Sequence, residues 1–382
     1  MMQQNYSVPH ILCVVGARPN FMKIAPLMRA FMAPGSGLTA SLVHTGQHYD
    51  AAMKHTFFDQ LHIPEPDVDL EVGSGSHAVQ TGQIMQRFEP VLEEHSPAAI
   101  LVVGDVNSTI ACALVAAKKG VPVIHVEAGL RSGDRAMPEE INRILTDQLS
   151  DLLFTTEAAA AANLQREGIA ADRIHFVGNV MIDSLRYNLA NAVSASATLA
   201  SAGAPPAFRD NGYGLLTLHR PSNVDDPDLL RGLLEVLAQI SEQTPLVFPV
   251  HPRTRARISD AGLDSLLNKA DILLLPPQGY LEMLGLMADA RLVLTDSGGI
   301  QEETTALGVP CLTLRENTER PITVDQGTNT VVGTDPDAIR KAHADILKGS
   351  DKAGRQPELW DGAAAQRIAA VIADWHRALR VA

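Results

Sequence analysis

The chain has 382 residues, well above the roughly 150 of an ordinary domain, which predicts two domains with a cleft between them. Hydrophobic residues make up 46% of the chain and aromatic residues only 4%, so helices packed on parallel strands are favoured over a β-sandwich. The net charge of −13 argues against nucleic-acid and anionic-membrane partners, which need a basic face, but still allows a few Arg and Lys to hold one phosphate-bearing ligand.

The first residues, MMQQNYSVPH, show no feature of a targeting segment. They lack the basic stretch and the long apolar region of a signal peptide, and no later apolar run reaches the length of a membrane span. We therefore expect a cytoplasmic protein. The three cysteines, Cys13, Cys112 and Cys311, lie inside apolar runs without C-x-x-C spacing, so buried free thiols are expected rather than a redox or metal role.

Short apolar runs alternate with helical stretches through the first part of the chain. ILCVVG, AAILVVGD and VPVIHVEAG are typical of buried strands, and helical patterns follow them. This βαβ order predicts a parallel sheet with helices on both faces. Residues 1–180 are therefore expected to form an α/β, Rossmann-like domain.

A second series of strands begins after residues 192–212, which are rich in Ala, Ser, Gly and Pro. It consists of YGLLTLH, PLVFPVH, DILLLPP, RLVLTDSG and VPCLTLR. We expect a second Rossmann-like domain over residues 181–361. The last helical stretch, about residues 362–382, is a candidate to pack back on the first domain.

Open α/β sheets bind ligands beyond the carboxyl ends of their strands, so the residues that follow each strand are the informative ones. Arg18 and Lys23 follow the first strand, in GARPNFMK, where they could face a phosphate or simply be surface charges. The same loop contains neither G-x-G-x-x-G nor G-x-x-x-x-G-K-[ST], which disfavours dinucleotide and P-loop sites.

Three acidic residues stand at strand ends of the first domain: Asp105 after ILVVG, Glu127 in VIHVEAG and Glu139 in MPEEINR. A carboxylate after an apolar run is costly to bury without a partner, and several together suggest acid/base chemistry or recognition of sugar hydroxyls. Glu139 and Arg143 are four apart on a predicted helix, so an ordinary surface ion pair is the alternative for them.

In the second domain, RLVLTDSGGIQEE runs from a buried strand into a helix through Ser297, Gly298 and Gly299. Two residues without side chains would let backbone N–H groups approach an anion at the positive end of the helix. Glu303, one turn later, could accept ribose hydroxyls or simply complement the helix start. His219 also ends a strand of this domain. No H-E-x-x-H or His/Cys spacing predicts a metal site.

Nine motifs, taken in order, resemble those of the non-hydrolysing UDP-N-acetylglucosamine 2-epimerases. They span nearly the whole chain, and HVEAGLR together with DSGGIQEE is the most specific pair. The resemblance implies a glycosyltransferase-B-like fold of two Rossmann-like domains, an active site in the interdomain cleft and no cofactor; we also expect a homodimer. The motifs are GARPNFMK, HTGQHYD, GDVNST, HVEAGLRSGDRAMPEEINR, VGNVMIDS, LHRPSNVD, PVHPR, LTDSGGIQEE and ENTERP.

The resemblance also implies a role for individual residues. Asp105, Glu127 and Glu139 would be the catalytic carboxylates, with His219 as a further catalytic group. Gln278, Met283 and Arg320 rest on the resemblance alone. The substrate-binding residues would be Arg18, Lys23, Arg143, Gln278, Met283 through its backbone, Ser297, Gly298, Gly299, Glu303 and Arg320, with His219 beside the diphosphate.

Two segments depart from the pattern of the family. The stretch from Gly133 to Glu139 is shorter than in some members, which weakens the placement of Glu139. Asp50 stands where members activated by their own substrate carry Gln, so we expect no such activation; Asp50 would instead cap a helix.

The implied reaction is reversible epimerisation at C2 of UDP-N-acetylglucosamine (UDP-GlcNAc) to UDP-N-acetylmannosamine (UDP-ManNAc). UDP would leave to give 2-acetamidoglucal and then add back. The alternatives are a C2 epimerase of a UDP-2,3-diacetamido sugar or its uronic acid, a glycosyltransferase of the same fold, a hydrolysing epimerase and a catalytically silent sugar-nucleotide sensor.

Overall fold

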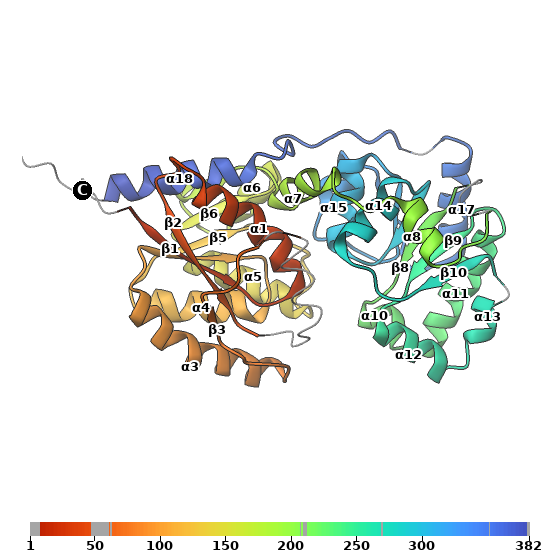
Figure 1. The fold of residues 1–382 in the computed structure, drawn as a ribbon, viewed down its shortest axis with the longest axis horizontal. Coiled ribbons are helices and arrows are strands. Elements are labelled where there is room, and N and C mark those ends of the chain that lie inside the picture. Colours follow the sequence, from red (N-terminus) through yellow and green to blue (C-terminus); the bar gives the residue numbers. More distant parts are fainter. Residues whose placement is uncertain are drawn as a thin grey trace, which may run out of the picture. The chain divides into compact units, whose positions relative to one another are not determined.

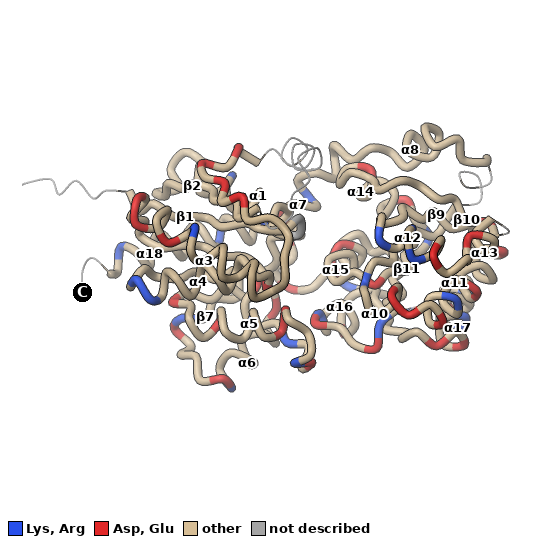
Figure 2. Tube along the Cα trace, turned by 90° about the horizontal axis from the view of Figure 1, so that it is seen from below, with Lys and Arg blue, Asp and Glu red and all other residues tan. Residues whose placement is uncertain are grey.

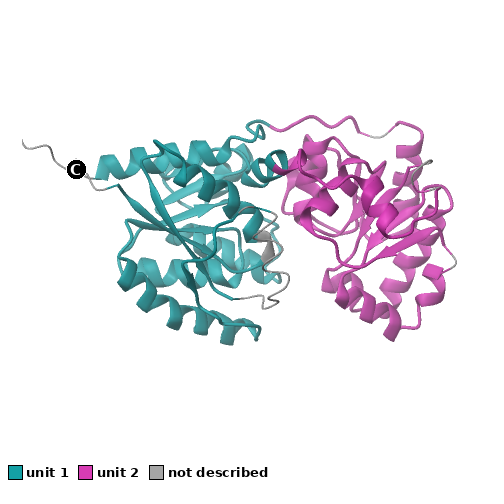
Figure 3. Cartoon of the chain, viewed as in Figure 1, with its two compact units in different colours: residues 1–187, 358–382 teal, residues 188–357 magenta. Residues whose placement is uncertain are grey.

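The computed structural model describes residues 8–46, 61, 63–206, 208, 212–268, 270–350 and 352–379. The chain divides into two compact units, unit 1 with residues 1–187 and 358–382 and unit 2 with residues 188–357 (Figure 3). The boundary expected at residue 180 falls at the start of a helix, α7 (Val180–Leu189), most of which belongs to unit 1. Asp50 lies outside the described residues.

Unit 1 is built on a seven-stranded sheet in which every pair of neighbouring strands is parallel (Figure 1). Its central strands are buried on both faces, which explains their continuous Val, Ile and Leu runs. The strands are β1 (His10–Val15), β2 (Thr39–His44), β3 (Val68–Asp69), β4 (Ala99–Val103), β5 (Val123–Val126), β6 (Leu152–Thr155) and β7 (Ile174–Phe176).

Helices cover both faces of this sheet. The helices α3, α4 and α5 pack side by side on one face, and α1 packs with α18 on the other (Figure 1). α18 comes from the C-terminal end of the chain, and the Asp183 carboxylate of α7 accepts its first two N–H groups, from Ala364 and Ala365. Besides α7, the helices are α1 (Arg18–Met32), α3 (His77–His95), α4 (Asn107–Lys118), α5 (Pro138–Leu149), α6 (Ala158–Arg166), the 3-10 helix η1 (Ala171–Arg173) and α18 (Ala364–Leu379).

Unit 2 repeats the plan with a six-stranded parallel sheet. Its core contains the apolar faces of α11 and α12 packed on strand residues such as Leu216, Phe248 and Leu294. The strands are β8 (Gly214–Thr217), β9 (Leu246–Pro249), β10 (Ile272–Leu275), β11 (Leu292–Thr295), β12 (Cys311–Thr313) and β13 (Asn329–Val331). The helices are α8 (Ala195–Ser201), α10 (Pro221–Val224), α11 (Pro227–Ser241), α12 (Pro252–Asp260), α13 (Asp264–Asn268), α14 (Tyr280–Ala288), α15 (Gly298–Leu307), α16 (Pro321–Asp325) and α17 (Pro336–Leu347).

The strand orders place the functional loops. Unit 1 follows β3-β2-β1-β4-β5-β6-β7 and unit 2 follows β10-β9-β8-β11-β12-β13, so both sheets have the doubly wound order. Strand order reverses between β1 and β4 in unit 1 and between β8 and β11 in unit 2, and ligands bind at such points in this architecture. The expected α/β class with two Rossmann-like domains is therefore confirmed.

Two further expectations can be compared with the structure. Cys13, Cys112 and Cys311 are buried and free, as predicted. Positions of Lys and Arg are scattered among those of Asp and Glu along both units (Figure 2). No described helix combines the length and the apolar character that crossing a bilayer requires.

Candidate active site

The turn that follows β1 is held by Asn20 in the first turn of α1. The Asn20 side-chain oxygen accepts the N–H groups of Gly16 and Ala17, and its amide donates to the Val103 carbonyl at the end of β4 at 3.0 Å. Asn20 is buried, so it joins the loops after β1 and β4 at the switch point of the sheet. The helix then presents Lys23, whereas the side chain of Arg18 lies outside the described part of the chain.

Glu127 directly follows β5 and forms a buried ion pair with Lys23. Lys23 Nζ lies 2.7 Å from the Glu127 carboxylate, and their side chains are 7% and 1% exposed. The ammonium group compensates for burial of the carboxylate, which would otherwise be costly. Lys23 is therefore no surface charge, which removes that alternative for this residue.

The backbone of Glu127 is unusual. Its φ is +73°, in the left-handed region that residues with a side chain rarely adopt. Such conformations persist only where the surrounding structure enforces them, and they concentrate at functional sites. Glu127 N–H and Ala128 N–H both donate to the Phe154 carbonyl of β6, and these bonds hold the turn.

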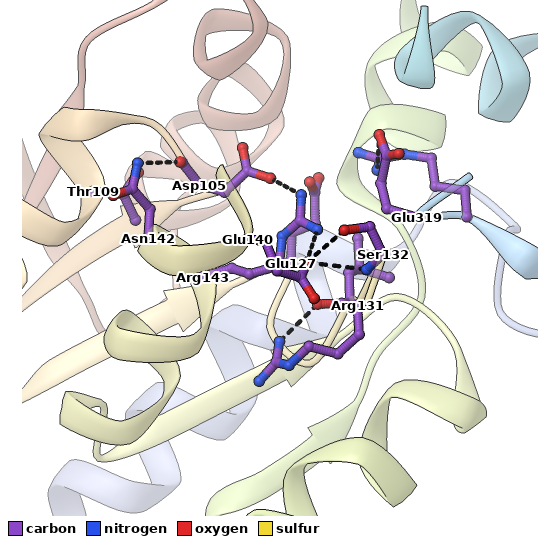
Figure 4. Close-up of polar contacts among 12 residues, drawn as sticks. Asp105, Thr109, Glu127, Arg131, Ser132, Glu140, Asn142, Arg143 and Glu319 are labelled. Atoms are coloured by element: carbon purple, nitrogen blue, oxygen red, sulfur yellow. Dashed lines mark hydrogen bonds and ion pairs between the residues drawn. The ribbon is translucent and has the colours of Figure 1, made fainter. Parts of the chain in front are cut away.

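Asp105 follows β4 and is held by Arg143 of α5 (Figure 4). Arg143 Nη2 lies 2.5 Å from Asp105 Oδ2, and Arg143 Nη1 lies 2.6 Å from Glu140 Oε2. Asn142 of the same helix donates to the Asp105 carbonyl at 2.9 Å. Gly104, with φ of +68°, lets the chain turn directly before Asp105, and a Cβ there would lie 2.9 Å from Lys23 Nζ. The structure thus brings Asp105, Glu127, Lys23 and Arg143 together.

Glu139 differs from its neighbour in α5. The sequence offered Glu139 as the ion-pair partner of Arg143, but Glu140 takes that place. Glu140 also accepts the N–H groups of Ser132 and Gly133, and these bonds with the Arg143 charge hold its pKa below the usual range although burial would raise it. Glu139 is half-buried, and no described residue forms an ion pair with its carboxylate.

In unit 2, the loop after β11 leads directly into α15. Ser297 is the N-cap residue, but its hydroxyl makes no capping bond; its N–H donates to Thr295 Oγ1 at 3.0 Å. Gly298 and Gly299 form the first turn, where N–H groups lack partners within the helix and attract anions. A Cβ on Gly298 would lie 2.6 Å from Glu319 Oε1, so a larger residue there would have to displace that carboxylate.

Glu319 anchors a group of arginines near that helix start. Its carboxylate lies 2.8 Å from Arg315, 3.2 Å from Arg320 and 3.7 Å from Arg220. Burial would raise the pKa of Glu319, but the arginines, Arg320 first, hold it far below its usual range. Arg320 also lies 3.0 Å from Glu302, so two carboxylates fix its guanidinium near Gly298.

His219 is held by Asp296, the last residue before Ser297. His219 Nδ1 lies 2.9 Å from Asp296 Oδ1, and the N–H groups of His219 and Arg220 both donate to the same carboxylate. Burial would raise the pKa of Asp296, but the hydrogen bonds and charge of His219 keep it below its usual value. The His219 ring is 43% exposed, which leaves Nε2 open to a ligand. His251 caps α12 by accepting the Arg253 N–H through Nδ1.

Glu303 lies inside unit 2 and is not an exposed charge at a helix start. Its side chain accepts a hydrogen bond from the Tyr280 hydroxyl at 3.1 Å. Burial raises the pKa of Glu303 to about 7; the bond from Tyr280 lowers it and the neighbouring Glu302 raises it. The carboxyl group therefore titrates near neutral pH.

Replacing Glu303 by Gln is expected to stabilise the free protein at high pH. The pKa of Glu303 is about 4.5 in the unfolded chain and about 7 in the folded protein, so folding disfavours the ionised form. The protein therefore loses stability as the pH rises from about 4.5 to 7, and the loss is complete above pH 7. Gln cannot ionise and still accepts from Tyr280. Urea unfolding should give Glu303→Gln up to about 3 kcal/mol more stability than wild type at pH 8, and no gain near pH 4. The exposed Glu235→Gln is the control; an equal gain at both pH values would contradict the expectation.

Two residues assigned by resemblance alone occupy the neighbourhood of α14. Gln278 precedes the helix and donates to the Pro276 carbonyl at 2.8 Å. Met283 lies within α14, where its N–H donates to the Gly279 carbonyl at 3.0 Å. This N–H therefore bonds within the helix, and of the two Met283 backbone groups only the carbonyl could accept a hydrogen bond from a nucleobase.

Sequence reasoning did not select several residues that shape these sites. Asp296 and Glu319 were present in DSGG and ENTERP, but nothing in a single sequence shows which carboxylate turns inward. Glu140 lies three residues before Arg143 and Glu139 four, and both spacings allow contact on a helix.

Among the described residues, no group of His, Cys, Asp and Glu could hold a metal ion.

Comparison with known proteins gives consistent matches over nearly the whole chain. A family model described as UDP-N-acetylglucosamine 2-epimerase matches residues 32–373. UDP-N-acetylglucosamine 2-epimerase of Methanocaldococcus jannaschii is 41% identical over 362 residues, covering 94% of this chain and 97% of the relative. UDP-2,3-diacetamido-2,3-dideoxy-D-glucuronate 2-epimerase of Pseudomonas aeruginosa is 44% identical over 332 residues, covering 86% and 90%.

Solved structures agree with these matches. A crystal structure of the M. jannaschii UDP-GlcNAc 2-epimerase with UDP-GlcNAc and UDP superposes with a TM-score of 0.83 at 40% identity, covering 95% of this chain and 99% of that one. The Neisseria meningitidis UDP-GlcNAc 2-epimerase bound to UDP-GlcNAc gives 0.86 at 30% identity, covering 96% and 100%. These matches agree with the fold, the carboxylates after β4 and β5 and the two glycines that begin α15, and the chain belongs to the UDP-N-acetylglucosamine 2-epimerase family.

Proposed function

We propose that the protein interconverts UDP-GlcNAc and UDP-ManNAc by eliminating and re-adding UDP. The observation that carries the proposal is the buried pair of Glu127 and Lys23 beside Asp105 and Arg143, because inversion at C2 needs acid/base groups. Relatives named as UDP-GlcNAc 2-epimerases support the substrate.

The chemistry of the sugar explains why carboxylates could act as the acid and base groups of the reaction. C2 of the sugar is flanked by an amide nitrogen and an acetal, so a carbanion there would have no stabilisation. In the proposed reaction a base removes the C2 proton as the C1–O bond breaks. UDP leaves with the electron pair of the C1–O bond, and the electron pair of the C2–H bond forms the C1–C2 double bond. The product is 2-acetamidoglucal. UDP oxygen then adds to C1 while an acid delivers a proton to the opposite face of C2.

Unit 1 would supply the proton-transfer groups. Asp105, Glu127 and Glu139 are the candidates, and Glu139 is the one whose carboxylate no described residue pairs with. Arg143 would position Asp105, which it contacts at 2.5 Å. Lys23 would add positive charge close to the leaving diphosphate, and we assign Arg18 the same task.

Unit 2 would hold the nucleotide. The Ser297–Gly299 turn and Arg320 offer N–H donors and a guanidinium to the diphosphate, and His219 Nε2 offers a further donor. Preorganised donors of this kind stabilise the charge that develops as UDP departs. Glu303 would accept ribose hydroxyls, and Gln278 with Met283 would bound the uracil.

Turnover in D2O tests the mechanism. Elimination and re-addition should place deuterium at C2 of both epimers, and long incubation should release traces of UDP and 2-acetamidoglucal. NMR of the products follows both signals. Epimers that keep their original C2 hydrogen would sink the elimination mechanism, and release of free ManNAc would identify a hydrolysing enzyme.

A second substrate has a specific observation in its favour. The P. aeruginosa relative, whose name specifies UDP-2,3-diacetamido-2,3-dideoxy-D-glucuronate, is 44% identical to this chain. Parallel incubations with UDP-GlcNAc and with the diacetamido uronate would separate the two, because only the true substrate gives a high kcat/KM. We also propose a homodimer, which light scattering tests against the monomer mass of 40.9 kDa.

A further inference from the structure

A fully buried histidine and aspartate lie beneath the carboxylates of unit 1. His125 is in β5, Asp147 is in α5, and both side chains are 0% exposed. His125 Nδ1 lies 2.7 Å from Asp147 Oδ1, and His125 Nε2 lies 2.8 Å from the Gly104 carbonyl oxygen. Neither residue is assigned a role in the proposed reaction.

The partners of the ring determine its charge. A carbonyl oxygen can only accept a hydrogen bond, so Nε2 must carry a proton. The carboxylate on the other side also accepts, so Nδ1 must carry one as well, unless Asp147 itself is protonated. An imidazole that donates from both nitrogens is an imidazolium cation.

The surroundings of Asp147 favour a carboxylate anion. Its second oxygen accepts the Gly129 N–H at 3.1 Å and lies 2.8 Å from Arg131 Nη2. Arg131 in turn lies 2.6 Å from Glu167. With His125 protonated, the charges of His125, Asp147, Arg131 and Glu167 alternate in sign, so Asp147 compensates the buried cation and itself lies between two cations.

This pair joins the three segments that carry the proposed catalytic carboxylates. His125 fixes the Gly104 carbonyl, directly before Asp105. Asp147 fixes Gly129, two residues after Glu127, where a positive φ of +80° bends the chain. Asp147 also belongs to α5, which carries Glu139 two turns earlier. A loss of charge here would loosen all three segments at once.

We propose that His125 is a buried imidazolium that, together with Asp147, positions Asp105, Glu127 and Glu139 for the reaction. The positioning role rests on the proposed function, whereas the charge of His125 is independent of it. His125 and Asp147 are positioning residues, because both side chains are fully buried and act through the segments that carry the three carboxylates.

NMR of the protein labelled with 15N-histidine tests the charge. The chain contains 13 histidines, and the His125 signal is identified by its loss in His125→Gln. Both ring nitrogens of His125 should show the shifts of protonated nitrogen in the folded protein at neutral pH, because both have acceptors as partners. A neutral ring would overturn the proposal, whether or not the enzyme is active.

Asp147→Asn tests the positioning role with almost no change of shape. The Asn oxygen can accept from Gly129 and Arg131, and its amide can donate to a neutral His125, so each hydrogen bond survives while the charge pair is lost. We expect a neutral His125 ring, a kcat lowered at least about tenfold, and UDP affinity within about twofold of wild type.

Asp151→Asn is the matched control. Asp151 accepts the Val123 N–H at 2.8 Å at the opposite end of β5, so its replacement should leave kcat unchanged. Wild-type kcat in a folded Asp147→Asn protein would refute the positioning role. If Asp147→Asn did not fold, the NMR result on wild type would still decide the charge of His125, and a neutral ring would refute the proposal. A wild-type protein without epimerase activity would refute the proposed function alone.

Discussion

Replacing Glu127 by Gln is expected to lower kcat by about 10²- to 10⁴-fold while UDP binds almost as in the wild type. The exchange keeps the volume of the side chain and the ability to accept from Lys23 at 2.7 Å, but it removes the capacity to take a proton. Because the positive φ of Glu127 is enforced by bonds of its backbone to β6, the turn should survive. The loss should therefore appear in the chemical step.

The effect is measured by initial rates with UDP-GlcNAc and by calorimetric titration with UDP. Glu93→Gln is a matched control, because Glu93 also pairs with a lysine, Lys119, at 2.6 Å, but on the surface. Its kcat should equal that of wild type. A Glu127→Gln enzyme with unchanged turnover would exclude Glu127 as an acid/base group and leave Asp105 and Glu139 as candidates.

The fold could be predicted because its signals are local and repeated. A run such as AAILVVGD predicts a buried strand by composition, and the helical pattern after it predicts a right-handed crossover and hence a parallel neighbour. The position of the first boundary was harder to predict. α7 begins at Val180 and continues to Leu189 without a break in helical pattern, so nothing in the sequence marks residue 187 as the end of a unit.

The candidate site could be predicted in part for the same reason. Asp105, Glu127 and the Ser297–Gly299 turn follow strands, and strand ends are recognisable. Partner choice, in contrast, depends on the spatial phase of helices and on contacts between distant segments. Arg143 contacts Glu140 and Asp105, which are three and 38 residues away in sequence, and only the first spacing could have been considered from sequence.

Lys23 and Glu303 show a second limit of sequence reasoning. Either could be read as an exposed charge, because charged side chains on helices usually face solvent. Burial depends on what covers them: the Glu127 turn contacts Lys23, and Tyr280 of α14 contacts Glu303. A sequence pattern describes the helix that carries a residue but not the segment that packs against its side chain.

Replacing Gly298 by Val is expected to abolish UDP binding. Already a Cβ would lie 2.6 Å from Glu319 Oε1, and the Glu319 carboxylate has little freedom to move because Arg315 and Arg320 hold it. The branched side chain would displace both the carboxylate and the arginines, and it would cover N–H groups at the start of α15. Overpacking of this kind costs about 1–3 kcal/mol of stability, which a folded two-unit protein can tolerate.

Calorimetry with UDP should therefore show no binding by Gly298→Val, although circular dichroism reports a folded protein. Gly232→Val provides the control: Gly232 lies in α11 of the same unit, and no atom lies within 4 Å of a Cβ placed there. That variant should bind UDP with wild-type affinity and lose no stability, because Val disfavours a helix less than Gly does. If Gly298→Val bound UDP as tightly as Gly232→Val, the diphosphate could not depend on the helix start, and the arginines around Glu319 would have to bind it elsewhere. Loss of binding in the first variant alone would instead assign the diphosphate to the start of α15, where the N–H groups of the helix and the arginines held by Glu319 lie together.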